Sequence, residues 1–212
     1  MKVLLSISSK SLVAALLMFG IVSLSAQVRY QATPGSKLKL DGTSTIHDWT
    51  VESSIIGGFI EFESADALDP AKASGEVKAR VEVNVPVTSL KSGKKPMDEI
   101  MHDAMKVKDH KNVKFVLKDM KAQPRQAGQP LKFNTLGELT VAGVTKPIDL
   151  VVTLEPEGNK LKASGSKQVK MTDFGIKPPA PALGLGFIKT ADEVTVTFEW
   201  NTRKVTKTAA AN

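Results

Sequence analysis

The side chains that most often catalyse reactions or bind metals are few in this sequence, and their spacing suits neither role. Histidine occurs only at positions 47, 102 and 110, cysteine is absent, and no histidine pair has the spacing of a helical zinc motif. A Gly-x-Ser-x-Gly elbow is also absent, and Gly184 and Gly186 lack the third glycine of a dinucleotide fingerprint. We therefore expect no catalytic residue, no metal and no cofactor, and we regard His47 and His102 as hydrogen-bonded or exposed histidines.

Apolar side chains at alternating positions are the more informative pattern. In the segment 131–154, large apolar residues occupy odd positions before a turn and even positions after it. Successive side chains of a strand point to opposite faces, so this phase change predicts a hairpin with one buried face. Gly143 can adopt a positive φ in the turn, and Pro147, which has no N–H group, is expected to open the second strand.

Several other segments alternate in the same way. Residues 75–89 carry apolar side chains at every odd position from Val77 to Val87 and predict the strongest strand. Strands are also expected at 113–118 and 194–200, with weaker candidates at 37–40, 46–52, 58–63 and 161–169. About eight to ten short strands separated by turn residues predict an antiparallel barrel or sandwich.

One segment between Ser89 and Asn112 has helical periodicity instead. Pro96 suits a first helical turn, and Met97, Ile100, Met101, Ala104 and Met105 recur at steps of three and four residues. The sequence therefore predicts one inserted amphipathic helix. Its methionine-rich face either packs on the sheet as core or closes one end of a barrel and contacts what the barrel holds.

The N-terminus has the pattern of a secretory signal peptide. Lys2 and Lys10 lie before an apolar run from Leu12 to Leu24, and Ser25-Ala26 offers small residues for cleavage. We expect residues 1–26 to be removed and the protein to be periplasmic or secreted, although an uncleaved N-terminal anchor is the alternative. Cleavage leaves 212 − 26 = 186 residues, enough for one domain with its own core.

The charge pattern gives no sign of a nucleic-acid surface. The formal net charge of +7 falls to +5 without Lys2 and Lys10, and the basic residues are scattered between apolar ones. We expect no nucleic-acid partner.

The interior of such a barrel could be solid or hollow. The inward faces carry valine, leucine, isoleucine and phenylalanine, and charged positions are expected on the outer face or in turns. An eight-stranded barrel is about the smallest that can hold one small ligand, so this pattern fits an ordinary core and an apolar cavity equally well.

Four segments taken together resemble the YceI-like family of exported polyisoprenoid-binding proteins. They are TSTIHDW with GGFIEFE after it, MDEIMHDAMKVKDHKNVKFVL, LTVAGVTKPIDLVV, and MTDFGI followed by DEVTVTFEW. The likeness runs in order from about Lys37 to Trp200. It implies an all-β fold with one inserted helix, a lipocalin-like antiparallel β-barrel of about eight strands whose apolar pore takes an isoprenoid chain such as a polyprenyl phosphate or a quinone tail. The family has no established catalytic residues to transfer.

The residues expected to line such a pore are apolar side chains of the predicted strands and of the inserted helix. They are Val81, Val83, Val85, Met97, Met101, Met105, Phe115, Leu117, Leu139, Val141, Leu150, Val152, Val196 and Phe198. Lys91, Lys94 and Lys95 form the nearest basic cluster, from which Lys91 and Lys94, together with His102, are the candidate head-group contacts. The alternative for these charges is a solvated loop.

The remaining segments complete the predicted organisation. Residues 27–202 form the barrel domain, and the basic tail from 203 to 212 is expected to be disordered. The proline-rich stretch 176–187 is either a packed connection or a second gate over the pore.

The predicted function is to hold or carry an isoprenoid lipid or another long-chain amphiphile, as a monomer or a homodimer, with transient contact to a membrane surface left open. The alternative is a non-binding envelope stress or interaction protein that uses the barrel as a scaffold. An enzyme acting on a bound lipid is a third option, but the sequence shows no paired acid and base for it.

Overall fold

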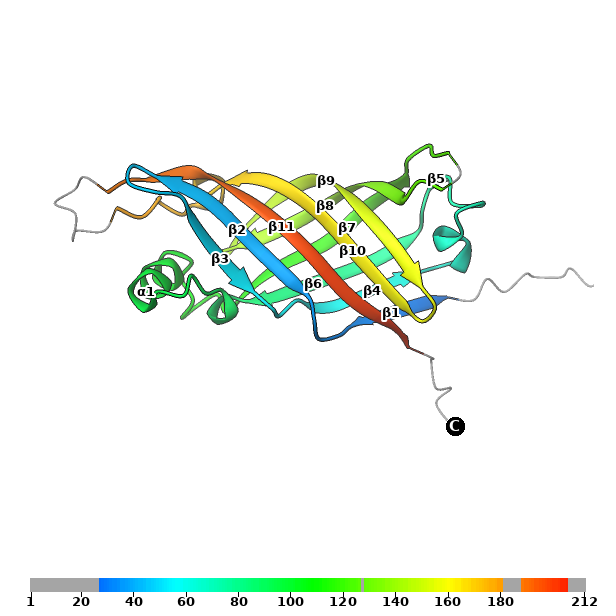
Figure 1. Cartoon of the computed structure of the whole chain (residues 1–212), viewed down its shortest axis with the longest axis horizontal. Helices are drawn as coiled ribbons and strands as arrows, with labels where there is room; N and C mark the ends of the chain where they lie inside the picture. Colours follow the sequence, from blue (N-terminus) through cyan, green and yellow to red (C-terminus); the bar gives the residue numbers. More distant parts are fainter. Residues whose placement is uncertain (1–26, 127, 181–187, 206–212) are drawn as a thin grey trace, which may run out of the picture.

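Antiparallel strands wrap into a barrel, and one helix covers one of its ends (Figure 1). The computed structural model describes residues 27–126, 128–180 and 188–205. The strands are β1 (Val28–Ala32), β2 (Lys37–Ser44), β3 (Trp49–Ser53), β4 (Gly57–Phe62), β5 (Gly75–Glu76), β6 (Ala79–Pro86), β7 (Asn112–Ala122), β8 (Leu131–Val141), β9 (Val144–Glu157), β10 (Lys160–Lys170) and β11 (Thr190–Val205). The helix α1 spans Lys95–Ala104, and short 3₁₀ turns occur at η1 (Ala65–Leu68), η2 (Val87–Ser89) and η3 (Thr172–Phe174).

Eight strands close the barrel in the order β1-β4-β6-β7-β8-β9-β10-β11, with β11 pairing back to β1. This confirms the predicted lipocalin-like antiparallel barrel with one inserted helix. β11 is long enough to pair twice on one edge: its last residues pair with β1, and its first part pairs with β2, which in turn pairs with β3. The bridge between Glu52 and Lys91 then ties β3 to the segment before α1.

The hairpin of β8 and β9 has the predicted phase. Phe133 lies opposite Val152, and the two-residue turn at Ala142 and Gly143 has φ values of 50° and 84°. Two consecutive positive φ values are typical of the tight turns whose twist matches that of a hairpin. Pro147 does not open the second strand as predicted, because β9 begins at Val144 and Pro147 lies opposite Glu138 within the ladder.

The strand predicted at 75–89 is also wrong in its bounds. The alternation at 75–89 does not form one strand: β5 ends at Glu76, β6 begins at Ala79, and Val87 starts η2. Val77 nevertheless keeps its place in the wall, because its N–H donates to the Met120 carbonyl oxygen over 2.8 Å.

The predicted disordered tail also begins too early. Residues 203–205 belong to β11, where they pair with β1, a strand that the sequence did not predict. The rest of the predicted tail, 206–212, and the predicted signal peptide, 1–26, lie outside the described residues.

The end of the barrel opposite α1 is filled by its own side chains. Phe62, Phe133 and Leu161 are fully buried there, and the Tyr30 and Phe62 rings meet edge to face with centroids 6.5 Å apart. The Thr202 hydroxyl donates to the Leu161 carbonyl oxygen over 2.7 Å, which satisfies a polar group within this core. This end is therefore a conventional packed core.

Candidate functional site: an apolar cavity in the barrel

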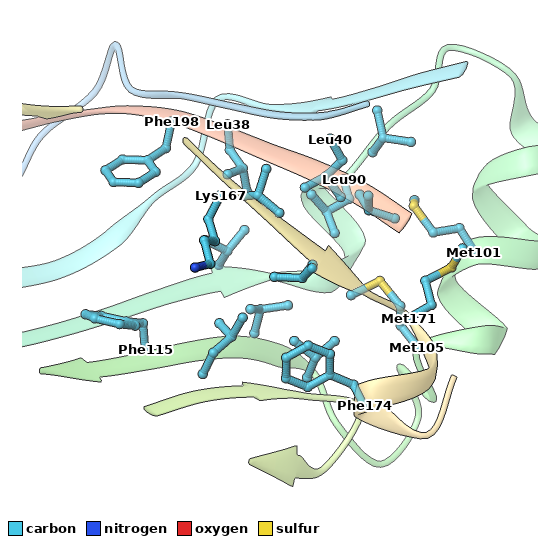
Figure 2. A pocket seen from close by; sticks show the side chains of 18 of the residues that line it. Leu38, Leu40, Leu90, Met101, Met105, Phe115, Lys167, Met171, Phe174 and Phe198 are labelled. Carbon is cyan, nitrogen blue, oxygen red and sulfur yellow. The ribbon is translucent and has the colours of Figure 1, made fainter. Parts of the chain in front are cut away.

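The rest of the barrel is hollow. A cavity of about 940 Å³ extends from α1 toward the packed end and is lined by residues of the barrel strands, the β2–β3 hairpin and the helix (Figure 2). Pockets that hold small molecules usually measure roughly 300–1,000 Å³, so this cavity lies near the upper end of that range. The sequence left open whether the interior is solid or hollow, and the barrel has one solid end and one hollow end.

Each of the residues predicted to line a pore does line this cavity. From the strands they are Val81, Val83, Val85, Phe115, Leu117, Leu139, Val141, Leu150, Val152, Val196 and Phe198, and from the helix region Met97, Met101 and Met105. They converge because the cross-strand register keeps the apolar faces in phase, as in the pair of Phe115 with Leu139. Their role in ligand binding stays a prediction.

The helix lies at the end of the cavity with its apolar face turned inward. Met101 and Met105 point toward Met171 and Phe174 of the loop after β10 (Figure 2). Met105 is buried, whereas Ile100 is 37% exposed although it lines the same cavity. The methionine-rich face therefore contacts the hollow part of the barrel, which agrees with the predicted end-closing helix.

A buried carboxylate fixes the helix to the preceding loop. Asp98 Oδ1 accepts hydrogen bonds from the Ser92 backbone N–H and the Ser92 hydroxyl, each over 2.7 Å. Burial by itself would raise the pKa of Asp98, but these hydrogen bonds and the nearby charge of Lys91 outweigh it and hold the pKa below its usual value. The ionised carboxylate is thus part of what holds α1 over the cavity.

Only one of the predicted head-group residues lines the cavity. Lys94, the residue before α1, does so. Lys91 instead lies 3.8 Å from the Asp98 carboxylate, and Nε2 of His102 is 3.0 Å from the Leu90 carbonyl oxygen. Both of these side chains hold the loop and helix together outside the cavity lining.

The structure also adds residues that the sequence analysis missed. The lining includes Leu38, Leu40 and Trp49 of the β2–β3 hairpin and Met171, Phe174 and Ile176 of the loop after β10. The expectation that charges avoid the inner face is wrong at Lys167, which lines the cavity on β10. Its odd position within the predicted strand 161–169, in phase with Leu161 and Ala163, was the available signal.

The proline-rich stretch 176–187 is only partly described. Ile176 is buried and Pro179 lines the cavity, so the start of the stretch is a packed connection. Residues 181–187 lie outside the described residues, and the second gate predicted for this stretch stays a prediction.

Neither a metal centre nor a membrane-spanning helix is found within the described ranges. No group of three or more His, Cys, Asp or Glu side chains there could hold a metal ion. His47 lines the cavity, and its Nδ1 lies 2.8 Å from the Asp48 carbonyl oxygen. No helix within 27–126, 128–180 and 188–205 has both the length and the apolar character needed to cross a bilayer.

Comparison with protein-family models matches residues 26–202 to the YceI-like domain. A UPF0312 protein of Pseudomonas putida is 27% identical over 155 residues, which cover 68% of this chain and 77% of that protein. A UPF0312 protein of Pseudomonas fluorescens is 27% identical over 158 residues, which cover 69% of this chain and 78% of that protein.

Two solved structures share the fold at lower sequence identity. One is a polyisoprenoid-binding domain from Saccharophagus degradans, with a TM-score of 0.64 and 12% identity, covering 85% of this chain and 100% of that one. The other is BcnA of Burkholderia cenocepacia, with a TM-score of 0.60 and 21% identity, covering 78% of this chain and 95% of that one.

Proposed function

The chain belongs to the YceI-like family, and from that premise we propose that it binds an isoprenoid lipid in the cavity of its barrel. The observation that carries the proposal is the cavity of about 940 Å³ with its almost wholly apolar lining. The polyisoprenoid-binding domain of Saccharophagus degradans, which has the same fold, supports the choice of ligand class. A polyprenyl phosphate or a quinone-like lipid fits this class.

The energetics favour a long apolar chain as the ligand. Each buried CH₂ group contributes roughly 0.8 kcal/mol, so one five-carbon isoprene unit contributes up to about 4 kcal/mol before costs. Association costs on the order of 4–15 kcal/mol in lost freedom. About three or four enclosed units therefore suffice for tight binding without a dense set of polar contacts.

The rim of the cavity supports delivery of the lipid to and from a membrane surface. Ile46 and Ile100 line the cavity but are 60% and 37% exposed, and Lys94 lines the same end. Apolar side chains beside a basic one are what a transient contact with anionic lipid head groups requires. In this proposal the protein carries the lipid and performs no chemistry on it, so a labelled polyprenyl phosphate should be recovered unchanged.

The proposal places the protein in the periplasm or outside the cell after removal of the signal peptide. Lys2, the apolar run from Leu12 and the small residues Ser25-Ala26 support export. Intact mass spectrometry of the protein from an envelope fraction should show a chain that starts near Gln27. A chain that starts at Met1 in the envelope would contradict cleavage and favour the uncleaved anchor, whereas a chain found in the cytoplasm would contradict export. Neither result would affect the cavity.

Native mass spectrometry of protein purified from its own envelope tests the binding function. We expect adducts whose masses correspond to isoprenoid lipids, and organic extraction of the same sample should release them. The spectrum also distinguishes a monomer from a homodimer, the two oligomeric states that the sequence leaves as alternatives. A protein that carries no lipid and takes up none when it is added would instead favour a non-binding scaffold.

A further inference from the structure

The charged side chains in the cavity lining are all lysines among the described residues. They are Lys94, Lys114, Lys167 and Lys170, and no aspartate or glutamate joins them. Three of these belong to the α1 end: Lys94 precedes α1, Lys114 lies near the start of β7, and Lys170 ends β10. The charge of the lining therefore complements an anion rather than a cation.

Lys167 differs from the other three because it occupies an inward position within a strand. It lies opposite Val196, a cavity residue of β11, and shares its face with Ala163 and Val169. Figure 2 shows its side chain between the rings of Phe115 and Phe198 on one side and the methionines near α1 on the other. A cation among apolar side chains costs solvation free energy, so its surroundings must compensate for it.

The solvation cost of the Lys167 charge is offset at a seam in the barrel wall, which is the stretch where β9 and β10 do not pair with each other. The ladder between β9 and β10 ends at the pair of Val152 and Gly165, although β9 starts at Val144 and β10 continues to Lys170. Beyond that pair the two strands have no mutual ladder among the described residues, and η3 contacts both of them. The barrel wall therefore lacks a β9–β10 ladder beside Lys167.

Lys167 reaches solvent through this seam. Its Nζ lies 3.0 Å from Oδ2 of Asp149, and the two side chains are 35% and 82% exposed. The stem of Lys167 therefore lines the cavity while its ammonium group lies at the boundary with water. Ion pairs with so exposed a partner are weak, so another anion can replace Asp149.

We propose that Lys167 is the head-group site of the barrel and binds the phosphate of an isoprenoid lipid at the seam between β9 and β10, in exchange for Asp149. An anionic head group placed among apolar side chains alone would be strongly disfavoured. At the seam it gains a counter-charge and remains partly hydrated, while the tail lies along the apolar cavity. This inference rests on the proposed function and specifies the head group and its site.

The test compares two lipids that differ only in the head group. Geranylgeranyl phosphate and geranylgeraniol are titrated into wild type and Lys167→Met, with the fluorescence of Trp49 and Trp200, both in the cavity lining, as the readout. Methionine keeps an unbranched apolar stem at this position. Lys162→Met is the matched control, because Lys162 pairs with Glu155 over 3.0 Å across the same two strands but outside the cavity.

We expect Lys167→Met to weaken binding of the phosphate by about tenfold or more, as loss of a charged hydrogen bond does, and binding of the alcohol by less than about threefold. Lys162→Met should change neither. Asp149→Asn should strengthen binding of the phosphate, because it frees Lys167. Should methionine disturb the fold, as judged by circular dichroism, Lys167→Gln replaces it.

The possible outcomes separate this inference from the proposed function. If wild type binds both lipids and Lys167→Met weakens both equally or neither, the head-group assignment is wrong and the lipid-binding function stands. If wild type binds neither lipid, both proposals fail. Inorganic phosphate alone should not bind measurably, because it buries no apolar surface; tight binding of it would overturn the assignment of this site to a lipid.

Discussion

Three inward glycines let aromatic rings lie flat against the barrel wall. A Cβ atom added at Gly42 would lie 2.1 Å from the Trp49 ring, and one added at Gly137 would lie 2.3 Å from the Phe115 ring. A Cβ atom added at Gly165 would lie 3.0 Å from the Phe198 ring, which is a less severe overlap. Trp49, Phe115 and Phe198 all line the cavity. Each glycine therefore gives its ring a place on the wall and keeps that ring out of the hollow space.

Gly42→Ala should reduce lipid binding. The three atoms nearest to the new Cβ all belong to the Trp49 ring, at 2.1, 2.5 and 2.7 Å, so the ring must move, and its free side is the cavity. We expect weaker binding of geranylgeraniol and a loss of about 1–3 kcal/mol in the free energy of unfolding, as overpacking typically costs. Fluorescence titration and urea denaturation measure the two effects.

A second substitution provides the control for this prediction. Trp49→Leu in the Gly42→Ala background removes the ring that the new methyl group displaces, and it should restore most of the binding. Leu136→Ala, on the outer face of β8 where Leu136 is 45% exposed, should leave binding unchanged. Full binding by Gly42→Ala would show that the ring position does not control the cavity.

At this scale the sequence predicted which residues face inward but not what they enclose. Alternation places Phe115 and Val152 on one face regardless of whether they touch other side chains or a void. Hollowness depends on the radius of the closed barrel, which no single strand specifies. Lys167 was missed although its position within the strand was visible, because an unpaired seam that lets a lysine reach water depends on the pairing of two strands.

At the scale of elements, α1 is held over the cavity by few polar contacts. Asp98 accepts hydrogen bonds from the Ser92 N–H and the Ser92 hydroxyl, and His102 contacts the Leu90 carbonyl oxygen. The side chain of the N-cap residue, Lys94, makes no capping hydrogen bond, although the backbone N–H of Lys94 donates to the Ser92 hydroxyl over 3.2 Å. Asp98 is therefore the main polar anchor of an element that otherwise depends on methionine packing.

Acid should loosen this helix. The folded-state pKa of Asp98 is lowered, so its ionised form stabilises the fold. This contribution is complete above the ordinary carboxyl pKa of about 4 and is lost as the pH falls through the lower folded-state value. Hydrogen exchange monitored by mass spectrometry should show faster exchange in the α1 peptide at acid pH, after correction for the intrinsic pH dependence, while β8 and β9 stay protected.

Removal of the carboxylate should have the same effect at neutral pH. Asp98→Ala removes the acceptor of the Ser92 N–H and the shorter of the two hydrogen bonds of the Ser92 hydroxyl, and it should cost about 1–3 kcal/mol. Glu99→Ala is the matched control on the same helix, because Glu99 makes only an exposed contact of 3.9 Å with Lys95. Equal protection of α1 in both variants would show that Asp98 does not anchor the helix.

The strands were predicted well where pairing is local and poorly where it is not. The β8–β9 hairpin shows its phase change in one continuous segment, and α1 shows its period of three and four within ten residues. β1 and the end of β11 pair with each other although they lie near opposite ends of the described chain. Neither short segment therefore predicts a strand from its own sequence pattern. The break between β5 and β6 interrupts pairing without interrupting the alternation, and the sequence pattern could not reveal it.

For the whole molecule, the central feature is the division of one barrel into a packed end and a hollow end. Phe62, Phe133 and Leu161 fill the packed end, which can support the fold without a ligand. The hollow end then tolerates a void because the stability of the barrel resides elsewhere. This arrangement predicts that a larger side chain that projects into the void itself, unlike a methyl group placed under the Trp49 ring at Gly42, displaces ligand without destabilising the protein.

Calorimetric titration of geranylgeraniol into wild type, Val83→Trp and Val151→Trp tests this claim most directly, with urea denaturation of each protein alongside. Val83 lines the cavity, whereas Val151 is 45% exposed on the outer face of β9. We predict that wild type and Val151→Trp bind the lipid, and that Val83→Trp binds it at least about tenfold more weakly with its free energy of unfolding unchanged within about 0.5 kcal/mol. A hollow, lipid-binding end is contradicted if wild type takes up no lipid, or if Val83→Trp loses the roughly 1–3 kcal/mol that overpacking of a solid core costs.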